Sequence, residues 1–227
     1  MEHDDIIAVP ETAVRFEDGR TKVVAPFAIG RWPVTVGQFA TFCKATGHVT
    51  AAERAGRKQT YADNDALRKV RANFKHKRYG FLPYERVEDV EAYHLSFADA
   101  TAYCCWAGVR LPTEAEWLAA AVQDWDRRVH PDAMLDAIND HGQRPRALKA
   151  IGTEWTADTH ALREVGDDAV PPVYPFVPQR SRRPGEWVIL RNGPMHVLST
   201  EWERNPFLVS LAPPEFFHAT VIFRVCR

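Results

Sequence analysis

The sequence predicts a single domain in which short β-strands are combined with a few capped helices. Its 227 residues are 45% hydrophobic and 26% charged, which is enough chain and apolar content to bury one sizeable core. Apolar and polar residues alternate weakly near the N-terminus, as they do in short strands, and later segments begin with helix-capping residues. The chain shows no regular internal repeat, so these observations favour one domain of mixed structure.

The N-terminal region predicts a β-hairpin followed by a helix. Residues 6–30 alternate around the turn signal EDG at positions 17–19, where the chain is expected to reverse. Thr35 can cap the helix that follows, and Gly47 can end it. The apolar side of this helix, at helical spacing, consists of Val36, Phe39, Phe42 and Cys43.

A polar and basic segment occupies residues 54–90. It has no sustained apolar period, so we expect an insertion or long loop within one domain spanning residues 1–227. Its stretch RKVRANFKHKRYGF interleaves Phe74 and Tyr79 with basic residues, a pattern that also occurs at nucleic-acid contacts. The acidic stretch VEDVE that follows can neutralise the basic residues, and basic loops are usually solvated. Nucleic-acid binding is therefore not expected.

Two further helices are predicted on either side of a tight corner. Ser96 can cap the first helix in a reciprocal capping box with Asp99, and Gly108 ends it. Thr113 can cap the second helix in the same way, with Glu116 three residues later. The apolar faces that can pack against each other are Phe97, Ala100 and Cys104 on the first helix and Trp117, Ala120 and Ala121 on the second.

Charge and cysteine content narrow the classes of function. The 29 basic and 30 acidic residues give a formal net charge of -1, so no overall field attracts nucleic acid or an anionic membrane. No apolar run reaches the length of a signal peptide or the roughly 20 residues of a membrane span, so we expect a cytoplasmic protein with no membrane partner. The four cysteines include no C-x-x-C pair, which favours buried, reduced thiols.

Four stretches of the chain are unusually specific: RWPVTVGQFATFCKATGHVTAAERAG, HLSFADATAYCCWAGVRLPTEAEWLAAA, IGTEWTAD and the terminal FRVCR. Together they resemble the formylglycine-generating enzyme family, also called the sulfatase-modifying factor family, and RLPTEAEW is the most specific element. The resemblance implies an α+β fold, a single C-type-lectin-like domain with twisted antiparallel sheets, two main helices and long loops. It also implies that the first and last strands lie close together, with Cys226 near Cys104.

The chemistry of the family is a separate question from its fold. The resemblance implies a copper-binding cysteine pair in the C-terminal third, which activates oxygen to convert a substrate cysteine to formylglycine. Residues 187–227 contain only Cys226, and thiolate ligation of Cu(I) needs at least two converging sulfurs. Cys104 and Cys105 are adjacent on a predicted helix and point about 100° apart. We therefore expect a pseudoenzyme that has lost formylglycine-generating activity, although the sequence leaves open whether it catalyses another reaction.

Two other metal sites that the resemblance implies find little support in the residues. The calcium-binding segment is shortened to KAIGTEW, which keeps Glu154 as a weak calcium candidate but places Lys149 nearby. Related sulfoxide synthases hold iron with three histidines that come mainly from an additional N-terminal helical domain. The nine histidines of this chain are scattered, with no H-x-x-x-H pattern. No cofactor is assigned on this basis.

The C-terminal loop carries the candidate binding site. Aromatic anchors mixed with a few charges are typical of recognition surfaces. The family also includes the variable proteins of diversity-generating retroelements, whose binding surface precedes a terminal FRV strand like the one here. The competing interpretation is that half of these aromatic residues belong to the core. The candidate ligand-binding residues are His196, Glu201, Trp202, Arg204, Phe216, Phe217 and His218.

The sequence therefore predicts a formylglycine-generating-enzyme-like protein that recognises a small molecule or a protein partner through its C-terminal loop. The alternative is a divergent metal-dependent oxidase of the same superfamily that holds copper or non-haem iron with unfamiliar ligands. Metal analysis of protein purified without a chelator distinguishes the two, because only the oxidase requires stoichiometric copper or iron.

Overall fold

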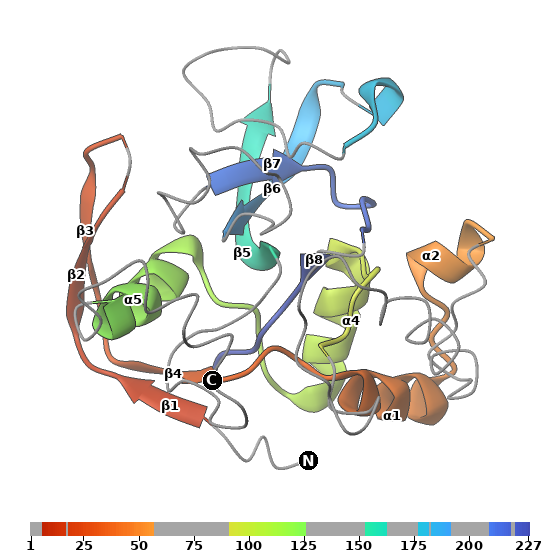
Figure 1. Ribbon diagram of the computed structural model, residues 1–227, viewed down its shortest axis with the longest axis horizontal. Helices are drawn as coiled ribbons and strands as arrows, with labels where there is room; N and C mark the ends of the chain where they lie inside the picture. Colours follow the sequence, from red (N-terminus) through yellow and green to blue (C-terminus); the bar gives the residue numbers. More distant parts are fainter. Residues whose placement is uncertain are drawn as a thin grey trace, which may run out of the picture.

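The computed structural model describes residues 6–16, 18–56, 91–125, 153–162, 177–181, 183–191, 209–218 and 221–227. In these residues, short N-terminal strands, helices and a C-terminal sheet are combined, which confirms the predicted α+β class (Figure 1). The expected basic insertion falls almost entirely outside the described residues, which stop at Gly56 and resume at Glu91.

The N-terminal strands form two antiparallel pairs. Strand β1 (Ile6–Val9) pairs with β4 (Phe27–Gly30), and β2 (Thr12–Arg15) pairs with β3 (Thr21–Val24). Both pairs belong to the hairpin predicted for residues 6–30, with Arg15 opposite Thr21 beside the turn and a φ of 85° at Gly19 within it. Glycine adopts this left-handed region without steric cost, which is why the turn signal contains it.

All but one of the described helices begin at the residues that the sequence indicates. They are α1 (Val36–Thr46), α2 (Ala51–Arg54), α4 (Phe97–Ala107) and α5 (Glu114–Trp125). Thr35 and Ser96 form capping boxes at α1 and α4, and these helices end at Gly47 and Gly108 with φ of 70° and 68°. Both predicted helix ends are therefore confirmed. The sequence analysis did not anticipate α2, which begins in its own capping box of Thr50 with Glu53.

The C-terminal sheet has the strand order β7-β6-β5-β8. Its strands are β5 (Thr153–Leu162), β6 (Gly185–Arg191), β7 (Val209–Ala212) and β8 (Val221–Ile222), and a 3-10 helix η2 (Gln179–Ser181) precedes β6. The β5–β6 and β6–β7 pairs are antiparallel, whereas β8 runs parallel to β5. The β5–β6 register shifts between Trp155 and Thr159, which indicates a bulge in β5.

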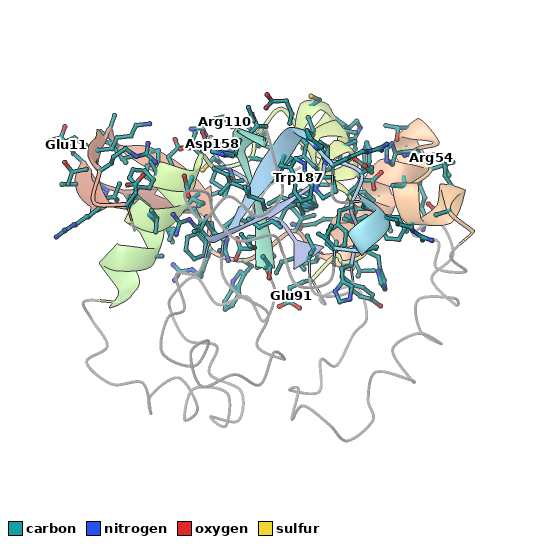
Figure 2. All side chains as sticks on the ribbon, turned by 90° about the horizontal axis from the view of Figure 1, so that it is seen from above. Glu11, Arg54, Glu91, Arg110, Asp158 and Trp187 are labelled. Carbon is teal, nitrogen blue, oxygen red and sulfur yellow. The ribbon has the colours of Figure 1, made fainter. Side chains whose placement is uncertain are left out.

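Two hydrophobic cores organise these elements. The main core lies between α1, α4 and the C-terminal sheet, and it includes Phe39, Tyr103 and Trp187. In Figure 2, Trp187 lies near the middle of the described side chains, between Glu11 at one end and Arg54 at the other. The N-terminal core joins α5 to the N-terminal strands. The expectation that α5 packs against α4 was therefore wrong: Trp117 and its apolar neighbours bury themselves against the strands instead.

The C-terminal residues add to the N-terminal sheet. The Gly30 amide donates to the Val225 carbonyl (2.8 Å), and the Arg227 amide donates to the Ala28 carbonyl (2.9 Å). Cys226 forms isolated β-bridges with both Ile29 and Arg110, so the C-terminal residues lie beside β4 and the corner that precedes α5 (Figure 1). This confirms the proximity of the first and last strands. Among the described helices, none is both long enough and apolar enough to cross a membrane.

Candidate functional site

In the RLPTEAEW motif (residues 110–117), Arg110, Thr113 and Glu116 bind one another at the start of α5. The Arg110 guanidinium donates to both oxygens of Glu116 (2.7 and 2.6 Å), and the Thr113 amide and hydroxyl donate to the same carboxylate (2.8 and 2.9 Å). Burial acts to raise the pKa of Glu116, but these hydrogen bonds outweigh it and lower that pKa. The capping box predicted for Thr113 is thus present and is held by an ion pair.

Glu114 and Trp117 of the same motif anchor α5 to the C-terminal sheet. Glu114 accepts from the buried guanidinium of Arg191 on β6, with an Nη2–Oε1 distance of 2.6 Å. The Trp117 indole donates to Glu154 on β5 (3.0 Å). These polar contacts give each of the side chains a structural role. RLPTEAEW, the most specific stretch of the sequence, therefore stabilises the fold.

Glu154 and Arg224 form an ion pair that is fully enclosed. Both side chains are 0% exposed, and the Arg224 guanidinium donates to both carboxylate oxygens of Glu154. The remaining Arg224 donor, Nη1, binds the backbone oxygens of Gly30 and Arg31 (3.0 and 2.8 Å). Arg224 and Trp117 therefore occupy the carboxylate of Glu154, which in this arrangement is not available as the calcium ligand that the sequence suggested.

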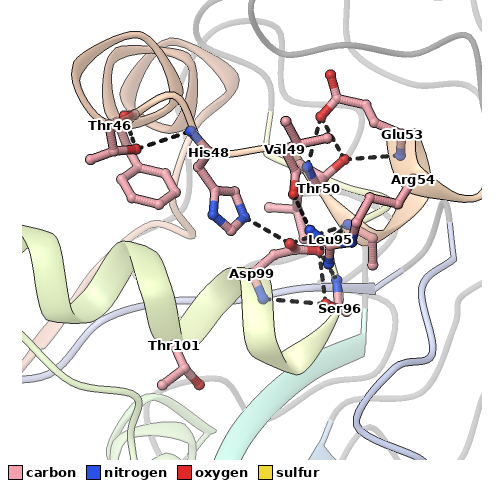
Figure 3. A network of polar contacts seen from close by, with 12 residues as sticks. Thr46, His48, Val49, Thr50, Glu53, Arg54, Leu95, Ser96, Asp99 and Thr101 are labelled. Atoms are coloured by element: carbon pink, nitrogen blue, oxygen red, sulfur yellow. Dashed lines mark hydrogen bonds and ion pairs between the residues drawn. The ribbon is translucent and has the colours of Figure 1, made fainter.

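A second buried carboxylate, Asp99, connects α4 to α2 (Figure 3). It accepts from the amide and hydroxyl of Ser96 (2.9 and 2.8 Å), from the Ala51 amide (3.2 Å) and from Nε2 of His48 (2.8 Å). Asp99 therefore satisfies donors at the N-termini of two helices, where a negative charge is favourable. Its carboxylate is 0% exposed and serves to hold these elements together.

All four cysteines lie in the described residues, and all are free thiols. Cys43, Cys104 and Cys226 are buried, and burial raises the pKa of each to about 12. Cys105 is exposed, so the two adjacent cysteines of α4 point in different directions as predicted. A copper site of the family type needs two converging thiolates. The stretch where the resemblance places the copper pair, residues 187–227, contains only Cys226.

Five ring side chains gather where the segment after β7 meets the start of α4. We call this group, Tyr93, His94, Phe216, Phe217 and His218, the aromatic–imidazole cluster. The ring centroids of His94 and His218 are 6.5 Å apart, and His94 also contacts Tyr93 and Phe217. The His218 ring stacks on Phe216 with an interplanar angle of 5°. Burial raises the pKa of Tyr93 to about 12, so its hydroxyl remains protonated.

Backbone hydrogen bonds hold the aromatic–imidazole cluster together. The His94 amide donates to the His218 carbonyl (3.1 Å), which also accepts from the Val221 amide (3.1 Å). The Phe97 amide at the start of α4 donates to the Pro214 carbonyl (3.1 Å). His94 has a φ of 59°, a left-handed conformation that is uncommon outside glycine. The two histidines are therefore fixed relative to each other by the main chain.

The structure describes only part of the predicted binding site. His196, Glu201, Trp202 and Arg204 lie outside the described residues. Phe216 is 8% exposed and belongs to the main core, as the competing interpretation held for some of the aromatic residues. Phe217 and His218 are half-buried at the edge of that core. The C-terminal segment thus combines packing residues with partly exposed ones.

Sequence reasoning missed the contribution of Tyr93 and His94. They precede the cap of α4 in the stretch AYHLSF, which carries no periodic or motif signal of binding. Their proximity to Phe217 and His218 depends on how β7 and β8 are connected, so it could be found only in the folded chain. Within the described residues, no group of three or more His, Cys, Asp or Glu side chains is placed to hold a metal ion.

The fold and the structural role of the motif define an α+β scaffold of the formylglycine-generating type. Residues 8–178 match the family of the sulfatase-modifying factor enzyme 1-like domain, and the chain belongs to this family. A solved structure of PvdO from Pseudomonas aeruginosa shares the fold, with a TM-score of 0.55, 17% identity, and coverage of 98% of this chain and 93% of that one.

Curated relatives differ in activity. The chain is 39% identical over 127 residues to a formylglycine-generating enzyme of Streptomyces coelicolor, covering 46% of this chain and 40% of that protein. It is 35% identical to an inactive C-alpha-formylglycine-generating enzyme 2 of Bos taurus, over 49% of this chain and 43% of that protein. It is 30% identical to a hercynine oxygenase of Mycobacterium tuberculosis, over 75% of this chain and 45% of that protein. The matches span less than half the length of each of these relatives.

Proposed function

We propose that this chain is a formylglycine-generating-enzyme-like protein that has lost copper oxidase chemistry and recognises a small molecule or a protein partner through its C-terminal loop region. The observation that supports the proposal most directly is the difference in exposure between the cysteine thiols and the rings of the C-terminal segment. Three of the four thiols are buried in the cores, whereas the side chains of Phe217 and His218 in the C-terminal segment remain partly exposed.

The state of the cysteines supports the loss of oxidase chemistry. Residues 187–227, where the resemblance places the copper pair, contain only Cys226, and burial raises the pKa of Cys43, Cys104 and Cys226 to about 12. Cys43 and Cys104 also belong to the main core, whereas Cys226 belongs to the N-terminal core. The likeness to an inactive relative is consistent with this proposal.

The C-terminal segment supports a role in recognition. Phe217 and His218 are half-buried, so each keeps one side packed while the other remains accessible. Side chains that combine a fixed orientation with an apolar face lose little conformational entropy on binding and serve well as interface anchors. Trp202, which precedes this segment in the chain, supplies a further aromatic anchor in the proposal.

The test compares variants in binding to a partner isolated with the full chain. We expect Phe217→Ala and Trp202→Ala to weaken binding at least tenfold while the melting temperature stays within a few degrees. The matched control is Val23→Ala, because Val23 is 63% exposed on the distant hairpin. Phe216→Ala is the stability control, with an expected loss of about 3 kcal/mol or more from the main core. Unchanged binding in both test variants would contradict the proposal.

A second candidate function is a divergent metal-dependent oxidase. The observation that favours it is the similarity to a hercynine oxygenase, which extends over 205 residues. This candidate requires copper or non-haem iron in stoichiometric amount. Elemental analysis of protein purified without a chelator decides between the two: recognition alone predicts neither metal, whereas one copper or iron per chain would favour the oxidase.

A further inference from the structure

The β2–β3 part of the N-terminal hairpin has one covered face and one open face. It stands at the margin of the molecule, beyond α5 (Figure 1). Val14 and Val24 belong to the N-terminal core, which joins these strands to α5. Side chains alternate between the two faces of a strand, so Ala13 and Val23, which lie directly opposite each other, occupy the other face. Both are exposed to solvent, and Val23 is 63% exposed.

The outer edge of β3 is open as well. The Phe16 amide donates to the Arg20 carbonyl (2.9 Å), and hydrogen-bonded pairs alternate with other pairs along an antiparallel ladder. Counted from this bond, the backbone groups of Thr21, Val23 and Ala25 point away from β2. Within the described residues, β3 pairs with β2 alone. Thr21, Val23 and Ala25 are all exposed, so another strand can reach their backbone groups.

We propose that β3 pairs with β3 of a second copy of the chain, antiparallel and about a two-fold axis at Val23. Val23 then exchanges both backbone hydrogen bonds with Val23 of the second copy, and Thr21 does so with Ala25 of the second copy. An edge strand with unpaired backbone groups is a ready template for such pairing. Because the two-fold axis uses the same edge of both copies, association stops at the dimer.

The side chains of β3 favour this register over its neighbour. If the axis were shifted to Lys22, two ammonium groups would lie directly opposite each other, which is destabilising. With the axis at Val23, Lys22 instead lies opposite Val24 of the second copy. The two exposed valines then lie side by side on the open face, where each covers part of the other's apolar surface.

The charges on the open face favour a second copy of the chain as the partner. Arg15 lies opposite Thr21, and one position beyond the last pair of these strands, Glu11 comes level with Ala25. In the dimer, Arg15 of one copy and Glu11 of the other therefore stand at the two ends of one row across the sheet. The row spans about 14 Å, and only the small residues Thr21 and Ala25 lie between. The two long side chains can extend toward each other over these small residues.

This surface is separate from the proposed recognition surface. The hairpin packs on α5 in the N-terminal core, whereas Phe217 and His218 lie at the edge of the main core. Val23→Ala, the control of the partner-binding experiment, adds no charge and leaves the backbone groups of the β3 edge in place. Dimerisation and partner recognition can therefore fail independently of each other.

The experiment measures the mass of the full chain in solution by sedimentation equilibrium, at concentrations up to about 1 mM. The wild-type chain is expected to form dimers that increase with concentration, because a small interface gives weak association. Val23→Lys and Val23→Glu each place like charges opposite each other and should weaken dimerisation about tenfold or more. An equimolar mixture of the two variants should regain dimers, since a lysine then faces a glutamate. Val49→Lys is the matched control, because Val49 is 50% exposed and lies outside the hairpin.

A wild-type chain that stays monomeric at about 1 mM would overturn self-pairing and leave the β3 edge to a strand of another protein. Wild-type dimerisation of Val23→Lys alone, or no recovery in the mixture, would rule out the axis at Val23. Equal weakening in Val49→Lys would show that the loss does not arise at β3.

Circular dichroism melting shows whether each variant is folded. If a variant is not folded, amide hydrogen exchange in the wild-type chain decides the question. Exchange at Thr21, Val23 and Ala25 must slow as the protein concentration rises, whereas exchange at Ala13 on β2 must not. Exchange that is independent of concentration at all three β3-edge amides contradicts the proposal.

Discussion

At the scale of single residues, a buried ion pair fixes the C-terminal segment to β5 and to the N-terminal sheet. Arg224 is fully buried, and its donors are divided between Glu154 on β5 and the backbone after β4. Removing two charges from water is costly, and only close pairing with further hydrogen bonds compensates for that cost. Each partner therefore depends on the other, and the pair joins three segments that are distant in the sequence.

Replacing Glu154 tests this dependence. Glu154→Gln leaves the Arg224 guanidinium buried without its counter-charge, so the free energy of unfolding should fall by about 3–5 kcal/mol. The measurement is urea denaturation at neutral pH. Glu186→Gln on the neighbouring strand β6 is the matched control, because Glu186 is exposed and should change stability by less than about 0.5 kcal/mol. Similar losses in both variants would contradict the role of the pair.

The cysteines give a second prediction at this scale. At pH 8, Ellman's reagent should react rapidly with one thiol per native chain, Cys105, because the other three are buried and their pKa values of about 12 keep them protonated. In concentrated urea all four should react. Cys105→Ser should abolish the rapid phase, and a second rapidly reacting thiol in the native chain would show that the interior thiols are accessible.

At the scale of elements, local signals in the sequence proved sufficient for helix ends and insufficient for packing partners. Thr35, Ser96 and Thr113 were identified as caps because a capping box involves residues only three positions apart. The packing of α5 against the N-terminal strands depends on contacts between segments that are distant in the sequence, and no local sequence pattern predicts such contacts. The hairpin over residues 6–30, by contrast, was predictable, because both the β2–β3 and the β1–β4 pairs fold about one local turn.

The cap of α5 offers a test at this scale. Thr113→Ala removes the hydroxyl that accepts from the Glu116 amide (3.2 Å) and should lower the free energy of unfolding by about 1 kcal/mol. The matched control is Thr101→Ala on the exposed side of α4, where the hydroxyl only bonds back to the Phe97 carbonyl within the same helix. Thermal melting of both variants gives the comparison, and an unchanged transition for Thr113→Ala would count against the cap.

At the scale of the whole molecule, the fold of the family is kept, and three of the four thiols are buried in its cores. The fold class was predictable because RLPTEAEW and the terminal FRVCR are used by the scaffold itself, through Glu116, Trp117 and Arg224. The candidate site was predictable only in part. Phe217 and His218 were identified by composition, whereas Tyr93 and His94 join them through contacts that form only on folding.

We propose that the chain keeps the formylglycine-generating fold without copper–thiolate oxidation of cysteine. The most direct measurement incubates the purified chain with a peptide that contains the sulfatase C-x-P-x-R motif, with copper, oxygen and a thiol reductant. An active formylglycine-generating enzyme serves as the positive control, and mass spectrometry follows the peptide. We predict that the peptide cysteine keeps its mass, because residues 187–227, where the resemblance places the copper pair, contain only Cys226 and Cu(I) needs two converging thiolates. Conversion of that cysteine to formylglycine with repeated turnover would contradict the account.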